Sequence, residues 1–147
     1  MSRILIAGLG NELRGDDAAG LLAVRALRGL AAGDIDVVEH SGDAASLAES
    51  MLQYQEIVVI DAVAAGSAPG TVVRMPADSP STRSSTSSHG PGLRQAIALS
   101  HALGASPNVR IFGITGRTFE LGAAPSPEVV TAASEVAAEI REMFACA

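Results

Sequence analysis

The stretch Glu56-Ile57-Val58-Val59-Ile60-Asp61-Ala62-Val63 is the strongest strand signal in the chain. Its unbroken run of branched aliphatic residues is typical of a strand that helices bury on both faces of a parallel sheet. The apolar run ends at a carboxylate, Asp61, which we therefore expect at the C-terminal edge of the strand. Because sites in α/β proteins form beyond this edge, Asp61 is a candidate site residue, and its alternative role is to cap a turn.

On either side of this stretch, strand-like apolar runs alternate with segments of helical spacing. The sequence predicts strands at 3–8, 34–39, 56–63, 71–75 and 109–114, and helices at 16–30, 43–53, 93–103 and 126–144. Asp43 is the expected N-cap of the second helix. Ser126 is the expected N-cap of the last helix, with Pro127 at its first helical position.

This alternation predicts a single α/β domain over residues 1–147. We expect a three-layer sandwich, with helices on both faces of a mostly parallel sheet. The sheet becomes mixed if the strand after the Pro69-Gly70 turn runs antiparallel to its neighbour.

The composition narrows the possible functions. Of 147 residues, 48 % are hydrophobic but only 3 % are aromatic, so small and branched aliphatic residues must fill the core. The formal net charge of −6 argues against a nucleic-acid partner, since like charges repel. The apolar N-terminal run is too short to span a membrane and shows no signal-peptide pattern. The single cysteine, Cys146, cannot form an internal disulfide, so we expect a reducing, cytoplasmic location.

The turn after the first strand contains most of the polar signal. It reads Gly8-Leu9-Gly10-Asn11-Glu12-Leu13-Arg14-Gly15-Asp16-Asp17-Ala18-Ala19-Gly20. A dinucleotide-binding fingerprint requires glycine where this chain has Leu13, and two carboxylates would face the pyrophosphate. A nucleotide-binding oxidoreductase, with Glu39 holding a ribose, is therefore the weaker alternative.

Asp16 and Asp17 open the predicted helix at 16–30. Side chains of adjacent helical residues point about 100° apart, so only one of the two carboxylates can easily face a cleft. The other would cap the helix, where a carboxylate also favours the dipole. The spacing alone does not decide between them, and both could serve as caps.

His89 follows a polar, Ser-rich stretch that we interpret as a long loop. Taken alone, such a histidine is simply solvated. Together with Asp61 and one aspartate of the first turn, it would offer two oxygens and one nitrogen to a divalent metal such as nickel or zinc. Three protein ligands leave coordination positions open, as in a catalytic metal site. His40 follows a strand end and could line the same cleft, but we assign it, like His101, a structural or surface role.

These motifs together resemble those of the hydrogenase maturation endopeptidases. The turn from Gly8 to Gly20 is similar to the opening signature of that family. Later segments are similar to its other motifs, in the same order: Val59-Ile60-Asp61-Ala62 with Ala68-Pro69-Gly70-Thr71, Ser87-Ser88-His89-Gly90 with Gly92-Leu93, Gly113-Ile114 with Gly116-Arg117 and Phe119, then Gly122 and Ser126-Pro127-Glu128-Val129.

The resemblance implies both an activity and a site. By position, Asp17, Asp61 and His89 would be the metal-binding and catalytic residues, and Asp16 would be the helix cap. The implied reaction is one cut that removes a C-terminal extension from the precursor of a nickel–iron hydrogenase large subunit. The nickel would belong to the substrate, and no tightly bound organic cofactor is expected. A non-proteolytic factor that binds nickel or the precursor is the alternative.

Overall fold

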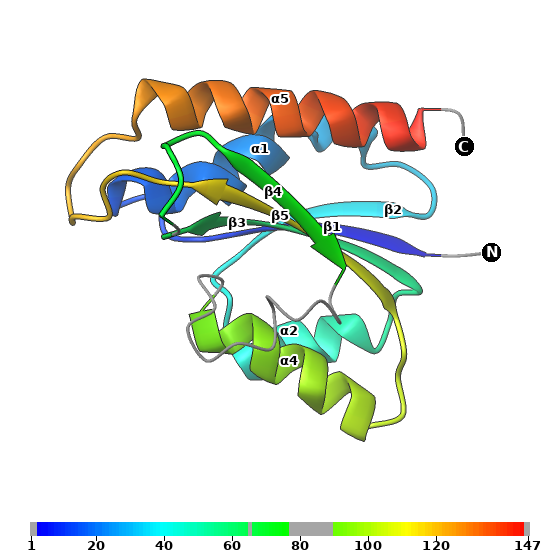
Figure 1. Ribbon diagram of the computed structural model, residues 1–147. Coiled ribbons are helices and arrows are strands. Elements are labelled where there is room, and N and C mark those ends of the chain that lie inside the picture. Colours follow the sequence, from blue (N-terminus) through cyan, green and yellow to red (C-terminus); the bar gives the residue numbers. More distant parts are fainter. Residues whose placement is uncertain (1–2, 65, 77–89, 146–147) are drawn as a thin grey trace.

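A mixed sheet forms the centre of the molecule (Figure 1). The computed structural model describes residues 3–64, 66–76 and 90–145, so His89 and Cys146 lie outside the described residues. The strands are β1 Ile4–Leu9, β2 Ile35–His40, β3 Glu56–Val63, β4 Val72–Pro76 and β5 Asn108–Thr115. Their order across the sheet is β2-β1-β3-β5-β4, with β1, β2, β3 and β5 parallel and β4 antiparallel to β5.

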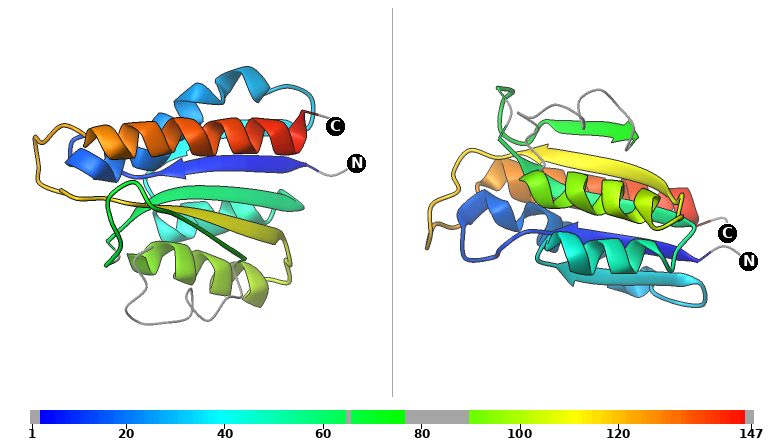
Figure 2. Two further views of the ribbon diagram at one scale, coloured as in Figure 1. Left: turned by 45° about the horizontal axis from the view of Figure 1, so that its top comes forward. Right: turned by 90° about the horizontal axis from the view of Figure 1, so that it is seen from below.

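Helices cover both faces of the sheet (Figures 1 and 2). The helices are α1 Ala19–Ala26, α2 Ala44–Met51, α4 Gly90–Ala102 and α5 Pro127–Phe144, with 3-10 turns η1 Gly15–Ala18 and η2 Arg28–Leu30 on either side of α1. One face packs against α1 and α5, and the other against α2 and α4. Among the described residues, no helix is long and apolar enough to cross a bilayer.

The core divides into two layers because side chains alternate along each strand. In β3, Val58 and Ile60 join the cluster beneath α1 and α5, whereas Ile57 and Val59 join the cluster beneath α2 and α4. All four side chains are at most 2 % exposed. A strand buried on both faces has no solvent side, which explains why the run at 56–63 lacks alternating polar residues.

The predicted architecture is confirmed, including the bounds of β3 and the antiparallel edge strand β4 that makes the sheet mixed. Asp43 is the N-cap of α2, and its side chain accepts the Ser46 backbone N–H at 3.0 Å. The other elements differ from their predicted ends by a few residues, as is usual at fraying termini.

The single helix predicted at 16–30 is wrong, because α1 is only its central part. At its start, the N–H groups of Gly15 and Asp16 donate to the carbonyls of Ala123 and Thr118, so a neighbouring loop determines the path of this turn. At its end, α1 stops at Ala26 and the chain continues as the 3-10 turn η2, which contains Gly29, a poor α-helix former.

Candidate active site

The candidate site lies where the strand order reverses. The chain leaves β1 to form β2 on one side of it, and β3 then pairs with the other side. The chain therefore leaves β1 toward one side of the sheet and leaves β3 toward the other. Such a reversal opens a crevice at the carboxyl ends of the two strands. A pocket of about 190 Å³ occupies this crevice and is lined by Leu9, Gly10, Asp17, Ser41, Gly42, Asp61, Gly92 and Leu93.

Asp61 lines this pocket. It lies near the end of β3 and is only 8 % exposed. Burial raises the pKa of the Asp61 carboxyl well above its ordinary value, and the nearby charge of Asp17 raises it further, against a smaller opposing effect of the Ala62 N–H. The ionised form of Asp61 is thus disfavoured unless a cation reaches the pocket.

Asp17 approaches the same pocket from η1 and is partly exposed. Its Oδ2 accepts the backbone N–H of Asn11 at 3.0 Å, so the turn after β1 bends around this carboxylate. Gly10 makes the bend possible with a φ of +143°, and a Cβ at this position would lie 2.0 Å from the Asp17 carbonyl oxygen. Only glycine fits at a point where two backbone segments approach so closely.

Asp16 faces away from the pocket and is fully buried. The expectation that it caps its own helix is wrong, because η1 and α1 have no side-chain cap. Its carboxylate instead accepts hydrogen bonds from the N–H groups of Arg117 at 2.7 Å and Thr118 at 3.2 Å. It also accepts both the N–H and the hydroxyl of Ser126. Asp16 therefore fastens the loop between β5 and α5 to the first turn.

The hydrogen bonds of Asp16 determine its charge state. Burial alone raises the pKa of this carboxyl, but the Ser126 and Arg117 N–H groups, the Ser126 hydroxyl and the Thr118 N–H together lower it by more. The net pKa of Asp16 lies below its ordinary value. The buried carboxylate thus stays ionised at neutral pH, since several donors replace its lost hydration.

The third predicted ligand, His89, lies outside the described residues. The next residue, Gly90, begins α4, and Gly92 and Leu93 in the first turn of this helix line the pocket. In the part of the chain that the structure describes, no three His, Cys, Asp or Glu side chains form a group that would hold a metal ion. The described site therefore consists of the two carboxylates of Asp17 and Asp61.

His40 supports the wall of the pocket, in agreement with the structural role assigned to it. Its Nδ1 accepts the N–H of Gly42 at 2.8 Å, and its Nε2 lies 3.3 Å from the Ser46 hydroxyl. Burial lowers the pKa of His40, against the opposing charge of Asp43. A neutral ring is required for Nδ1 to accept a hydrogen bond, so this environment and this contact agree.

Thr115 is a polar residue near the site that the sequence did not single out. It ends β5 opposite Val63, on the sheet face that also contains Asp61. The side chain is fully buried, and its Oγ1 has no hydrogen-bond partner among the described residues. The only sign of Thr115 in the sequence is its place at the end of an apolar strand. Threonine is mostly found on protein surfaces, so this sign is too weak to predict a buried residue.

Comparison with protein-family models assigns most of the chain to the family that its sequence motifs resemble. Residues 24–143 match the model of a family described as hydrogenase maturation protease, a range that includes Asp61 and His89 and begins after Asp17. No curated protein sequence matches the chain significantly.

Several solved structures share the fold across nearly their whole length. The [NiFe] hydrogenase maturation protease HybD from Thermococcus kodakarensis is 31% identical, with a TM-score of 0.74 over 97% of this chain and 99% of that one. The [NiFe] hydrogenase maturation protease HycI from Thermococcus kodakarensis KOD1 is 25% identical, with a TM-score of 0.80 over 98% and 93%. The hydrogenase maturating endopeptidase HybD from E. coli has a TM-score of 0.82 at 24% identity, over 97% and 94%.

Proposed function

Because the chain belongs to the hydrogenase maturation protease family and is thus a peptide hydrolase, we propose that it removes a C-terminal extension from the nickel-loaded precursor of a nickel–iron hydrogenase large subunit. The observation that carries the proposal is the meeting of Asp17 and Asp61 in one pocket at the β1–β3 crevice. The names of the two Thermococcus relatives, which are [NiFe] hydrogenase maturation proteases, support the choice of substrate class.

In this proposal the nickel is part of the substrate. The precursor holds the ion through its own cysteines, and Asp17, Asp61 and His89 complete the coordination with two oxygens and one nitrogen. The chemistry of the described pair fits a cation. Burial and the charge of Asp17 both disfavour ionised Asp61, and a divalent ion between the carboxylates would remove that penalty.

Recognition of the ion also positions the scissile peptide. Once the precursor is held at the pocket, the peptide bond and a water molecule are near the carboxylates, and this proximity supplies much of the rate. A carboxylate of the pair accepts a proton from the attacking water. The C–N bond then breaks, and that proton passes to the leaving amine. The products are the shortened precursor and the released C-terminal peptide.

The direct test is cleavage of purified precursor followed by mass spectrometry. We expect the chain to shorten the nickel-loaded precursor and to leave the nickel-free precursor intact. The variants Asp17→Asn, Asp61→Asn and His89→Ala should each process the precursor at least about 100-fold more slowly, as when a catalytic acid or base is lost. Asp43→Asn is the matched control, because asparagine caps a helix as well as aspartate does.

Two outcomes would contradict parts of this proposal. Equal cleavage of nickel-loaded and nickel-free precursor would exclude recognition through nickel. Stable binding of a precursor whose C-terminus stays intact would replace proteolysis with a binding role.

A further inference from the structure

Two leucines beside the site are unusually exposed. Leu13, in the turn between β1 and η1, is 61% exposed, and Leu121, in the loop between β5 and α5, is 70% exposed. These are the largest exposed fractions among the large hydrophobic side chains of the described residues. The two loops touch, because the Gly122 N–H donates to the Leu13 carbonyl at 2.7 Å. We call Leu13, Leu121 and the backbone that joins them the Leu13 face.

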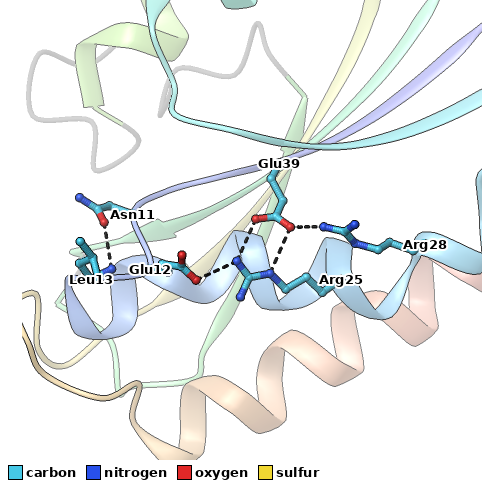
Figure 3. Close-up of polar contacts among 6 residues, drawn as sticks. All are labelled: Asn11, Glu12, Leu13, Arg25, Arg28 and Glu39. Carbon is cyan, nitrogen blue, oxygen red and sulfur yellow. Dashed lines mark hydrogen bonds and ion pairs between the residues drawn. The ribbon is translucent and has the colours of Figure 1, made fainter.

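The turn that carries Leu13 is held in place by its neighbours (Figure 3). The side chain of Asn11 accepts the Leu13 N–H at 2.9 Å. The adjacent Glu12 pairs with Arg25 of α1 at 3.0 Å, and Arg25 pairs in turn with Glu39 of β2 at 2.9 Å. The exposure of Leu13 is therefore not the result of a poorly supported loop.

The loop that carries Leu121 is fastened to the same turn. Its Ala123 and Thr118 carbonyls accept the N–H groups of Gly15 at 3.1 Å and Asp16 at 2.8 Å. The buried Asp16 carboxylate holds the two ends of this loop, as described above. Both leucines thus project from two loops that form one connected unit.

The position of the Leu13 face distinguishes it from scattered surface leucines, which are common and need no explanation. Asp17 lies on the same short turn as Leu13, and Asn11 contacts both of them through its side chain and its backbone N–H. A folded partner that brings a metal ion to Asp17 therefore comes close to the turn that carries Leu13.

We propose that the Leu13 face is the docking surface for the folded body of the hydrogenase precursor, which meets it with an apolar patch beside its nickel site. The inference rests on the proposed function and extends it from the ion to the protein around the ion. Pre-ordered loops lose little entropy on binding, and apolar anchors inside a polar rim typically dominate protein interfaces. Glu12 and Arg14, both exposed, supply polar rim beside Leu13.

The chain offers a matched control for this inference. Leu103 is 59% exposed, like Leu13, but it lies in the connection from α4 to β5, at the amino ends of the parallel strands and not at their carboxyl ends. We would prepare Leu13→Ser, Leu121→Ser, Leu13→Met and Leu103→Ser. Because all of these side chains are exposed, every variant should keep the melting temperature of the wild type.

The test is the steady-state cleavage of nickel-loaded precursor. Leu13→Ser and Leu121→Ser should each raise KM by about tenfold, as expected for interface anchors, with kcat changed less than about twofold. Leu13→Met should retain the wild-type KM because it remains apolar and of similar size. Leu103→Ser should change neither constant.

The outcomes separate this inference from the proposed function. If wild type cleaves the precursor but both serine variants keep its KM, the inference is wrong and the proteolytic function stands. If wild type leaves the precursor intact, the function fails, and the affinity of the same variants for immobilised nickel-loaded precursor then decides the inference. A dimer in sedimentation that Leu13→Ser dissociates would assign the face to a second copy of this chain instead.

Discussion

At the scale of single residues, Asp16 and Asp17 show how neighbours acquire different roles. The backbone rotates between them, so the Asp16 carboxylate points into the protein and the Asp17 carboxylate lines the pocket. Asp16 has several donors and a lowered pKa, whereas Asp61, the pocket partner of Asp17, has a raised one. Because their surroundings differ, Asp16 has a structural role, whereas Asp17 and Asp61 form the candidate site.

The raised pKa of Asp61 predicts a pH-dependent effect of its removal. Between the pKa of the unfolded chain and the higher pKa of the folded state, the folded protein binds more protons, so stability falls as the pH rises through this range. Asp61→Asn should therefore raise the melting temperature at pH 8 by about 3 °C or more, the shift expected for 1 kcal/mol in a domain of this size.

Thermal melts from pH 3 to pH 8 would check this prediction. The difference between Asp61→Asn and wild type should disappear below the ordinary pKa of aspartate, where both side chains are neutral. A variant less stable than wild type at pH 8 would show that ionised Asp61 has a stabilising partner. Processing should be lost at every pH, so that stability and activity change in opposite directions.

The unpartnered hydroxyl of Thr115 leads to a second prediction at this scale. A buried hydroxyl without a hydrogen bond lowers the free energy of unfolding, and valine has nearly the same shape. Thr115→Val should therefore raise the free energy of unfolding by about 1 kcal/mol. Urea denaturation at neutral pH measures this, and a loss of stability would indicate that the hydroxyl does bond in the folded protein.

At the scale of elements, glycines determine how closely α1 lies against the sheet. A Cβ on Gly20 would lie 2.2 Å from the Ile60 carbonyl oxygen of β3, and a Cβ on Gly8 would lie 2.1 Å from the Gly20 carbonyl oxygen. The helix can approach β1 and β3 only because both side chains are absent. Since η1 leads directly into α1, this approach also determines the position of Asp17.

Gly20→Ala should accordingly lower the free energy of unfolding by about 2 kcal/mol, as for an overpacked core, although alanine favours helix. Gly29→Ala is the control, because a Cβ there meets nothing within 4 Å. The control should be neutral or stabilising by up to about 1 kcal/mol. Urea denaturation compares the two variants, and equal stabilities would show that α1 can move outward at little cost.

At the scale of the whole molecule, the buried Asp16 carboxylate joins the first turn to the residue before the last helix, Ser126, which is 110 positions away in sequence. Ser126 occupies the N-cap position of α5, but its hydroxyl donates to Asp16 and does not cap the helix. The two ends of the fold are thus held together at the carboxyl edge of the sheet, beside the candidate site.

Asp16→Asn should lower the free energy of unfolding at neutral pH by about 3 kcal/mol, since it removes the charge from several hydrogen bonds and turns one acceptor into a donor. The pKa of Asp16 is lowered by folding, so its contribution is present above the ordinary pKa of aspartate and is lost as the pH falls through the folded-state value. The difference from wild type should therefore narrow in acid. A constant difference in urea melts at pH 7 and pH 3 would contradict this.

The sequence by itself determined the elements, the layers and the family, because hydrophobic period, turn residues and motif order are local properties of the chain. It singled out Asp61 by the same rule, as a carboxylate near the end of an apolar strand. Only the tertiary structure decided four other features. These are the strand order, the shortening of the predicted first helix, the hydrogen-bond partners of Asp16 and the exposed position of Leu13 on a supported turn. Each of these depends on groups that are distant in sequence, such as Thr118, Ala123 and Ser126, and no local pattern records which distant backbone donor or acceptor a side chain will meet.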